Sequence, residues 1–201
     1  MKKSLKDKVS DKLVKAFLKN KVISPIPKRF TKKLSEADKF RKLCESKIAE
    51  PIIGFKAGGT FIPLIKKLKE KEPFYASVFK RNLLKSGKKV KLNKYPVGIE
   101  VEVAFLLKKT FFSHSGKITK RNIIKYISHM APCIEVVGYR QRRKGVTSFG
   151  DLCSDFGGNV KFFLGQKKRY RKINIGNLKT NISNKKIKQK INENTAAIYI
   201  N

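Results

Sequence analysis

Residues 97–107 give the clearest strand signal in the sequence, and they include two acidic residues. Successive side chains of a strand point to opposite faces, so the large apolar side chains of this segment share one face: Ile99, Val101, Val103 and Phe105. Glu100 and Glu102 share the other face with the small residues Gly98 and Ala104. Two neighbouring carboxylates on one face repel each other unless a cation neutralises them. The alternation therefore predicts a half-buried strand with a cation beside its acidic face.

A third acidic residue, Glu135, interrupts another apolar segment at residues 132–137. A lone charge in an apolar strand also requires a partner. Three carboxylates and water molecules would suit Mg²⁺ or Mn²⁺, because both ions prefer oxygen ligands in octahedral geometry. The spacing alone leaves a second interpretation open, in which Glu100 and Glu102 face solvent and pair with some of the many lysines.

The chain is strongly basic, and its positive charge affects which partners it can bind. The 201 residues include 49 Lys and Arg against 14 Asp and Glu, which gives a formal net charge of +35. A field of this strength attracts polyanions such as nucleic acids. The basic residues are mostly lysines scattered along the chain, without a nucleic-acid-binding motif. We interpret the charge as a solvated surface with incidental polyanion binding, and a dedicated polyanion-binding protein is the alternative.

No apolar run approaches the roughly 18–20 residues of a membrane span, and the basic N-terminus lacks the apolar core of a secretory signal. The cysteines, Cys44, Cys133 and Cys153, are odd in number and lack a C-x-x-C or metal-type spacing. We therefore expect reduced thiols, no membrane partner and a cytoplasmic protein.

The apolar periodicity predicts both helices and strands. Helices are predicted at residues 4–19, from residue 35 through 44, and at residues 61–71 and 120–130. Ser35 and Asp38 form a variant of the capping box at the start of the second helix. Strands are predicted at residues 52–56, 97–107, 133–139 and 160–164, and residues 173–200 are predicted to form a hairpin with its turn near Asn184. Residues 73–92 are predicted to be irregular.

Several segments, taken in order, match the motifs of one enzyme family. Residues 53–60 (I-G-F-K-A-G-G-T) resemble V-G-W-K-I-G-L-T, residues 72–75 (E-P-F-Y) resemble E-P-x-Y-G, and residues 98–106 resemble V-E-A-E-I-A-F. Residues 131–140 resemble A-P-A-x-E-I-V-D-S-R, residues 151–165 resemble D-L-x-A-D-N-A-S-S-x-x-x-V-L-G, and residues 178–198 resemble a strand pair ending G-T-G-A-A-V. With this order and spacing, the chain resembles the fumarylacetoacetate hydrolase superfamily, in its 2-keto-4-pentenoate hydratase and 2-oxo-acid decarboxylase branch.

The resemblance implies an α+β fold, in which a mixed β-roll holds Mg²⁺ or Mn²⁺ beneath an N-terminal helical region. We expect residues 1–50 to form the helical region and residues 51–201 to form the metal-binding β-roll domain. We also expect this domain to be incomplete at its C-terminus, because the family chain continues further.

The family motifs also assign roles to individual residues. They imply three metal ligands, which are Glu100, Glu102 and Glu135. Lys56 would transfer a proton or stabilise the developing oxyanion, and Asp155 would orient a water molecule or relay a proton. Arg140 is a candidate for binding the substrate carboxylate, with an ion pair beside the metal as the alternative.

The implied activity is that of a divalent-metal-dependent lyase, which hydrates 2-hydroxypenta-2,4-dienoate-type substrates in aromatic catabolism. A 2-oxo-acid decarboxylase is an alternative, since both reactions use the same metal site. A catalytically impaired structural paralogue is another, because the Asn and paired Ser that follow the family aspartate are replaced here by Phe156, Gly158 and Asn159. The expected partners are a small 2-keto acid and further copies of the chain.

Overall fold

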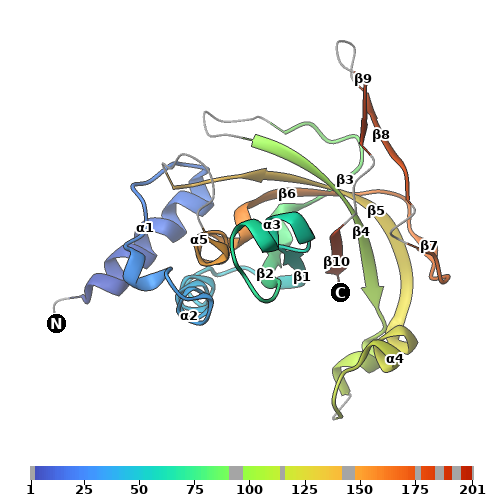
Figure 1. Cartoon of the computed structure of the whole chain (residues 1–201), viewed down its shortest axis with the longest axis horizontal. Coiled ribbons are helices and arrows are strands. Elements are labelled where there is room, and N and C mark those ends of the chain that lie inside the picture. The colour runs from blue at the N-terminus through green and yellow to red at the C-terminus, as the bar shows by residue number, and fades with distance from the viewer. Residues whose placement is uncertain are drawn as a thin grey trace.

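The structure is a computed structural model that describes residues 3–90, 97–113, 116–141, 148–174, 178–183, 188–191 and 196–200 (Figure 1). Its α-helices are α1 (Leu5–Lys19), α2 (Leu34–Glu45), α3 (Ile62–Lys67), α4 (Lys120–Ile123) and α5 (Phe149–Ser154). Its strands are β1 (Ile52–Gly58), β2 (Phe74–Phe79), β3 (Leu83–Lys85), β4 (Val97–Leu107), β5 (Ile127–Gly138), β6 (Asn159–Leu164), β7 (Lys168–Arg169), β8 (Thr180–Ser183), β9 (Lys188–Ile191) and β10 (Ala196–Ile200). Its 3-10 helices are η1 (Lys28–Phe30), η2 (Lys80–Asn82), η3 (Lys109–Ser113), η4 (Ile124–Tyr126) and η5 (Phe156–Gly158).

The predicted first helix is confirmed, and its start has a local cause. Ser4 is the N-cap of α1, and its hydroxyl accepts a hydrogen bond from the backbone N–H of Asp7. The capping box predicted for the second helix is wrong. α2 begins one residue earlier, with Lys33 as an N-cap that makes no side-chain hydrogen bond, and Asp38 pairs with Arg41 instead.

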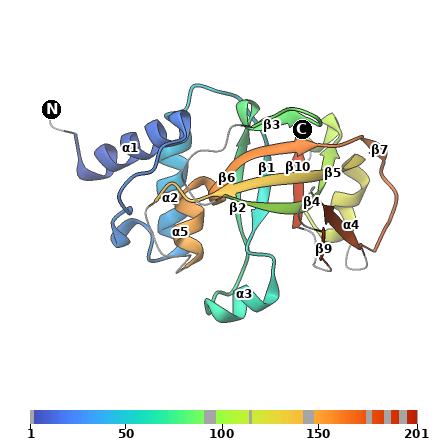
Figure 2. The ribbon, with the colours of Figure 1, turned by 90° about the horizontal axis from the view of Figure 1, so that it is seen from above.

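The helices α1 and α2 pack together at one end of the main sheet, with α4 at the other end (Figure 2). Their apolar stripes form a core cluster that also includes Phe79 of β2 and Phe156 of η5. The Phe17 ring centroid lies 4.5 Å from that of Phe156 and 5.6 Å from that of Phe79. The first helix thus contacts the turn that follows Asp155.

The main sheet is mixed, with the strand order β2-β1-β10-β4-β5-β6-β3 and β7 paired to β5. The hairpin predicted for residues 173–200 is confirmed for β8 and β9, but its extent is wrong, because β10 is a further described strand of this segment. β8 pairs with β9, whereas β10 lies between β1 and β4 and runs parallel to β4. The predicted turn near Asn184 lies outside the described residues.

The sheet is curled into a roll. β2 and β3 lie at opposite ends of the strand order, yet only the three residues of η2 separate them along the chain. Side-chain hydrogen bonds also join the two ends of the sheet. The side-chain amide of Asn159 donates to the backbone carbonyl of Ser77, and that of Asn82 donates to the backbone carbonyl of Val160. The prediction that residues 73–92 are irregular is therefore wrong, because β2 and β3 occupy part of this segment.

The longest pairing of the molecule joins β4 to β5, which are antiparallel from Val97↔Gly138 to Leu107↔Ile127. This pairing extends β5 into residues for which the sequence predicts a helix. The helical part ends with α4 and η4, and an extended backbone begins at Ile127. The predicted helix at residues 120–130 is thus wrong in its second half.

The described cysteines, Cys44, Cys133 and Cys153, are free and buried, as the sequence predicts. Among the described residues, no helix combines the length and the apolar character that a membrane crossing requires.

Candidate metal centre

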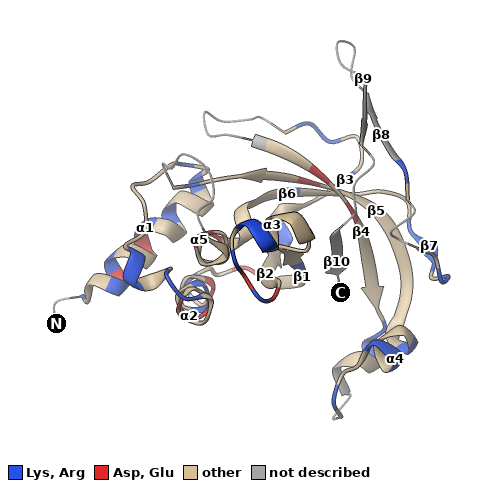
Figure 3. Cartoon of the chain, viewed as in Figure 1, with Lys and Arg blue, Asp and Glu red and all other residues tan. Residues whose placement is uncertain are grey.

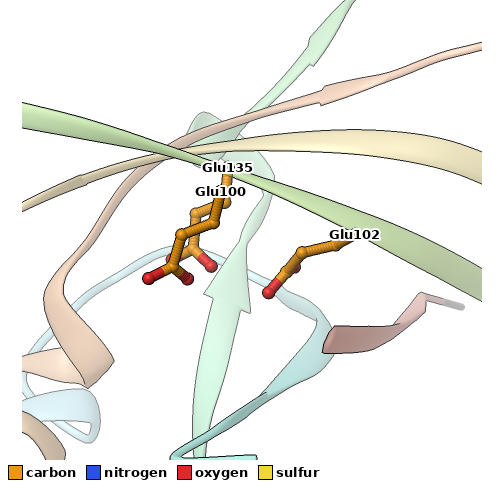
Figure 4. A group of neighbouring side chains, drawn as sticks. All are labelled: Glu100, Glu102 and Glu135. Carbon is orange, nitrogen blue, oxygen red and sulfur yellow. The ribbon is translucent and has the colours of Figure 1, made fainter. Parts of the chain in front are cut away.

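Glu100, Glu102 and Glu135 lie together on one face of β4 and β5 (Figure 4). The antiparallel register places Glu100 opposite Glu135, and Glu102 follows two positions along the same face. One carboxylate oxygen from each residue lies within 4.8 Å of the other two. The alternation predicted for β4 therefore brings these three carboxylates together, although they are separated by up to 35 positions in the sequence.

The three carboxylates differ in their access to solvent. Glu102 and Glu135 are 1% and 0% exposed, whereas the Glu100 side chain is 52% exposed. The alternative in which both glutamates of β4 face solvent is thus wrong for Glu102. The cluster is closed at Glu102 and open to solvent at Glu100.

Glu102 provides the test of whether a cation fits this site. As a carboxylate, Glu102 accepts no hydrogen bond at either oxygen in the described part of the chain, and only a proton shared with Glu135 would pair it. A buried polar atom without a partner costs free energy, and a buried charge costs more. A hard divalent cation is coordinated by carboxylate oxygens, so three carboxylates fit Mg²⁺ or a similar ion.

Burial and the mutual repulsion of the three carboxylates also control their protonation. Burial, followed by the charge of Glu135, raises the pKa of Glu102 to about 9. Burial and the charge of Glu100 raise the pKa of Glu135 to about 7, although Lys56 opposes this shift. The cluster therefore retains protons near neutral pH when no cation neutralises it.

Lys56 is the cation in contact with this cluster in the described structure. It lies on β1 and is 4% exposed, and its Nζ is 2.7 Å from Glu135 Oε2 and 3.8 Å from Glu100 Oε2. Burial lowers the pKa of Lys56, but the charges of Glu135, Glu100 and Glu102 outweigh burial and raise it overall. Lys56 is thus a buried ammonium group facing three carboxylates.

Arg140 and Asp155 lie in contact with each other. The Arg140 Nη1 is 3.0 Å from Asp155 Oδ1, and the Arg140 backbone N–H donates to Asp155 Oδ2 at 2.8 Å. Both residues are buried, and the Arg140 guanidinium also lies 4.8 Å from the ring centroid of Phe17. The structure thus forms an ion pair from two residues to which the family motifs assign separate roles.

Sequence reasoning missed the contact between Lys56 and the turn after Asp155. The Lys56 ammonium donates to the Gly157 carbonyl at 3.4 Å. Gly157 has a φ of +68°, and a Cβ placed there would lie 3.3 Å from Lys56 Cδ and 3.1 Å from Ala76 Cβ. The adjacent glycines Gly157 and Gly158 were the available signal, because a tight backbone approach favours glycine.

No protein-family model and no curated protein matches the sequence. The fold is similar to that of 4-oxalocrotonate decarboxylase from Pseudomonas putida G7, in a structure complexed with magnesium and adipate. The TM-score is 0.67 at 18% identity, over 82% of this chain and 65% of that chain. A second structure of that enzyme, complexed with calcium and acetate, gives a TM-score of 0.69 at 16% identity, over 88% of this chain and 69% of that chain.

The chain therefore spans about two thirds of the length of these solved structures. Their sequence identity to this chain is only 18% and 16%, so the similarity concerns the fold alone. It agrees with the α+β fold that the sequence resemblance implies, and this chain has the fold of these solved structures.

Proposed function

We propose that the chain is a divalent-metal-dependent lyase that acts on short 2-oxo acids or their dienol forms. The observation that carries this proposal is the buried Glu102, whose two oxygens lack hydrogen-bond partners among the described residues, beside the carboxylates of Glu100 and Glu135. The solved structures of similar fold contain magnesium with adipate and calcium with acetate, which supports a hard cation and a small carboxylate ligand.

Decarboxylation is the reaction that we propose to test first. The sequence resemblance favours hydration of a 2-hydroxypenta-2,4-dienoate and keeps decarboxylation as an alternative. Since the similar solved structures are those of a decarboxylase, they support the alternative. Hydration of the dienoate is the second candidate, because the same carboxylate cluster would serve it.

In this proposal Glu100, Glu102 and Glu135 hold Mg²⁺. When bound, the ion would supply Lewis-acid stabilisation for the enolate of a 2-oxo acid. Without the ion, Lys56 is protonated at Nζ, because the neighbouring carboxylates raise its pKa. Those charges are offset when an ion is bound, so Lys56 can donate a hydrogen bond or a proton to developing negative charge and take the proton back.

The Arg140–Asp155 pair has a positioning role in this proposal. Asp155 begins the turn whose Gly157 carbonyl accepts a hydrogen bond from Lys56. By holding Asp155 through two hydrogen bonds, Arg140 fixes the start of this turn. The catalytic role of Asp155 and the binding of a substrate carboxylate by Arg140 remain predictions, because the two charges are engaged with each other.

Two features of the molecule favour a small anionic substrate. The exposed Glu100 marks the side from which a ligand can reach the cluster. The net charge of +35 attracts dianions by long-range steering, which accelerates encounter at low ionic strength.

The activity is tested by incubating the purified chain and Mg²⁺ with 4-oxalocrotonate or with 2-hydroxypenta-2,4-dienoate. Carbon dioxide release and the loss of dienoate absorbance measure the two reactions. We expect turnover that Glu102→Gln and Lys56→Met abolish and that Glu72→Gln, which removes an exposed carboxylate, preserves. A chain that binds Mg²⁺ and turns over neither substrate would refute the enzyme proposal in favour of the structural paralogue.

We also propose that the protein is cytoplasmic and forms a homo-oligomer. Three free buried thiols agree with a reducing compartment. The mass of the particle by light scattering measures the oligomeric state.

A further inference from the structure

The face of β4 and β5 opposite the glutamates borders a cavity of about 460 Å³. Strand alternation directs the side chains of Val101 and Val103 away from Glu100 and Glu102. Together with Met130 and Pro132 of β5, these valines form the apolar floor of the cavity. The volume and apolar lining are those of a site for a small organic molecule.

Four basic residues line the same cavity, two of them in β7 and two beyond it: Lys168, Arg169, Arg171 and Lys179. All four are exposed, and within the described ranges none of them takes part in an ion pair. Figure 3 shows this basic segment at β7, beside the long β4–β5 pair. The cavity thus combines an apolar floor with a cationic rim.

We propose that this cavity binds a small amphipathic organic anion, with an apolar body on the valine floor and a carboxylate or phosphate head at the cationic rim. The apolar floor gains free energy by releasing water from an apolar ligand body. The rim guanidinium groups bind an oxyanion through charge-assisted hydrogen bonds. Glu102 also belongs to the lining, but strand alternation directs its side chain to the other face, and Glu100 and Glu135 lie outside the lining.

The charges of the rim disfavour a second copy of the chain at this site. A two-fold interface places the same surface on both partners, so this cluster of four cations would be brought towards its own copy. Like charges at an interface repel, and the net charge of +35 adds to this repulsion.

The aromatic residue beside the rim disfavours a nucleic acid. Single-stranded nucleic acids bind basic grooves by stacking bases on free aromatic rings. Tyr170 is occupied by packing, because its ring lies edge-on to Phe105 at 6.2 Å between centroids and joins the cluster of Val103 and Ile127. The described lining of the cavity includes no aromatic residue.

Binding is tested by calorimetric titration of the chain with decanoate and with decyl phosphate, which compares the two head groups. We expect saturable 1:1 binding of at least one of them, and none of decyltrimethylammonium. The Arg169→Glu/Arg171→Glu variant should weaken binding at least about tenfold, because it removes two charged hydrogen-bond donors. The Lys12→Glu/Lys15→Glu variant makes the same charge change on exposed positions of α1 and should stay within about twofold.

A second pair of variants tests the floor. Val101→Trp should fill the cavity and abolish binding, whereas Ile99→Trp, on the same face but outside the lining, should preserve it. Circular dichroism verifies that each variant is folded, and Glu100→Gln, at a residue outside the lining, should bind decanoate normally. Loss of metal binding in Glu100→Gln with intact decanoate binding separates this inference from the proposed function.

Three results would overturn the inference. The first is the absence of saturable binding of both probes at millimolar concentration. The second is an equal loss of binding in the α1 control, which would reduce the effect to net charge. The third is a single-stranded oligonucleotide that displaces the probe and binds more tightly, with sensitivity to Arg169→Glu/Arg171→Glu, because this result would assign the surface to nucleic acid.

Discussion

Two of the buried ionic groups in the described part of the chain differ in their charge balance. In one, Arg140 meets Asp155, and the Asp155 carboxylate accepts two hydrogen bonds from Arg140. In the other, three carboxylates face the single ammonium group of Lys56, and both Glu102 oxygens lack partners within the described structure.

The difference indicates different roles. A buried ion pair with matched charges holds two parts of a chain in one arrangement, and here it does so although Arg140 Nε has no hydrogen-bond partner among the described residues. A buried group with an excess of one charge raises the energy of the folded chain, and such groups are typical of functional sites. We therefore interpret the Arg140–Asp155 pair as structural support and the glutamate cluster as a ligand site.

The largest expected effect concerns the balanced pair. Arg140→Met removes the positive charge beside the buried Asp155 carboxylate, leaves it the backbone N–H at position 140, and should lower the free energy of unfolding by about 3–5 kcal/mol. Urea unfolding followed by circular dichroism measures this loss. The double variant Arg140→Met/Asp155→Leu should recover part of it, since no unpaired charge remains. A loss below about 1 kcal/mol would show that the pair is not a structural support.

At the unbalanced cluster of glutamates, removal of a charge should raise the free energy of unfolding instead of lowering it. Because the folded chain raises the pKa of Glu102 to about 9, it binds a proton more tightly than the unfolded chain does. The stability of the metal-free chain should therefore fall as the pH rises from about 4.5 towards 9. Glu102→Gln removes this charge and should stabilise the metal-free chain by about 2 kcal/mol at pH 9, with little gain at pH 5.

Urea unfolding in the presence of a chelator, at both pH values, measures this gain. Glu72→Gln removes an exposed carboxylate and serves as the matched control. If Glu102→Gln destabilises the metal-free chain at pH 9, the carboxylate is stabilising and the proposed imbalance is refuted.

The same imbalance predicts a pH dependence of metal binding. The pKa values of Glu135 and Glu102 are raised to about 7 and about 9, so Mg²⁺ must displace protons from the cluster. Its affinity should rise by at least about a hundredfold from pH 6 to pH 8, because binding releases between about one and two protons over this range. Titration calorimetry in buffers of different ionisation enthalpy measures the protons released. A pH-independent affinity would contradict the raised pKa values.

The smallest expected effect on stability concerns the turn after Asp155, which connects the Arg140–Asp155 pair to Lys56. Gly157→Ala places a Cβ at a φ of +68°, 3.3 Å from Lys56 Cδ, and should cost about 1 kcal/mol of stability. Gly87→Ala is the matched control, because Gly87 has a φ of +84° and no atom within 4 Å of its added Cβ. A further loss of turnover in Gly157→Ala, absent in Gly87→Ala, would show that the turn positions Lys56. Equal effects of the two variants would contradict this link.

The sequence predicts the acidic cluster well because a strict period of two marks Glu100 and Glu102, and an apolar strand marks Glu135. It fails where pairing with distant segments decides the structure. Ile123, Ile124 and Ile127 have the spacing of a helix, but pairing with β4 makes the chain extended from residue 127 onward. β10 enters the sheet between β1 and β4, and no local pattern indicates this position.

The Arg140–Asp155 contact was missed for a related reason. The family motifs assign each residue to the site separately, so they do not indicate that the two side chains bind each other. The alternative role predicted for Arg140 was an ion pair, but the sequence did not indicate that Asp155 is its partner. The turn at Gly157, with Phe156 packed on Phe17, brings Asp155 to Arg140.

The central claim is that the unbalanced cluster of glutamates is a metal site. Titration of the chain with Mg²⁺ at pH 8, followed by calorimetry, tests it most directly. We predict saturable binding of one ion per chain, which Glu102→Gln abolishes and Glu72→Gln preserves, with both variants folded by circular dichroism. If the unmodified chain binds no Mg²⁺ or Mn²⁺, or if Glu102→Gln binds as tightly as the unmodified chain, the claim is wrong.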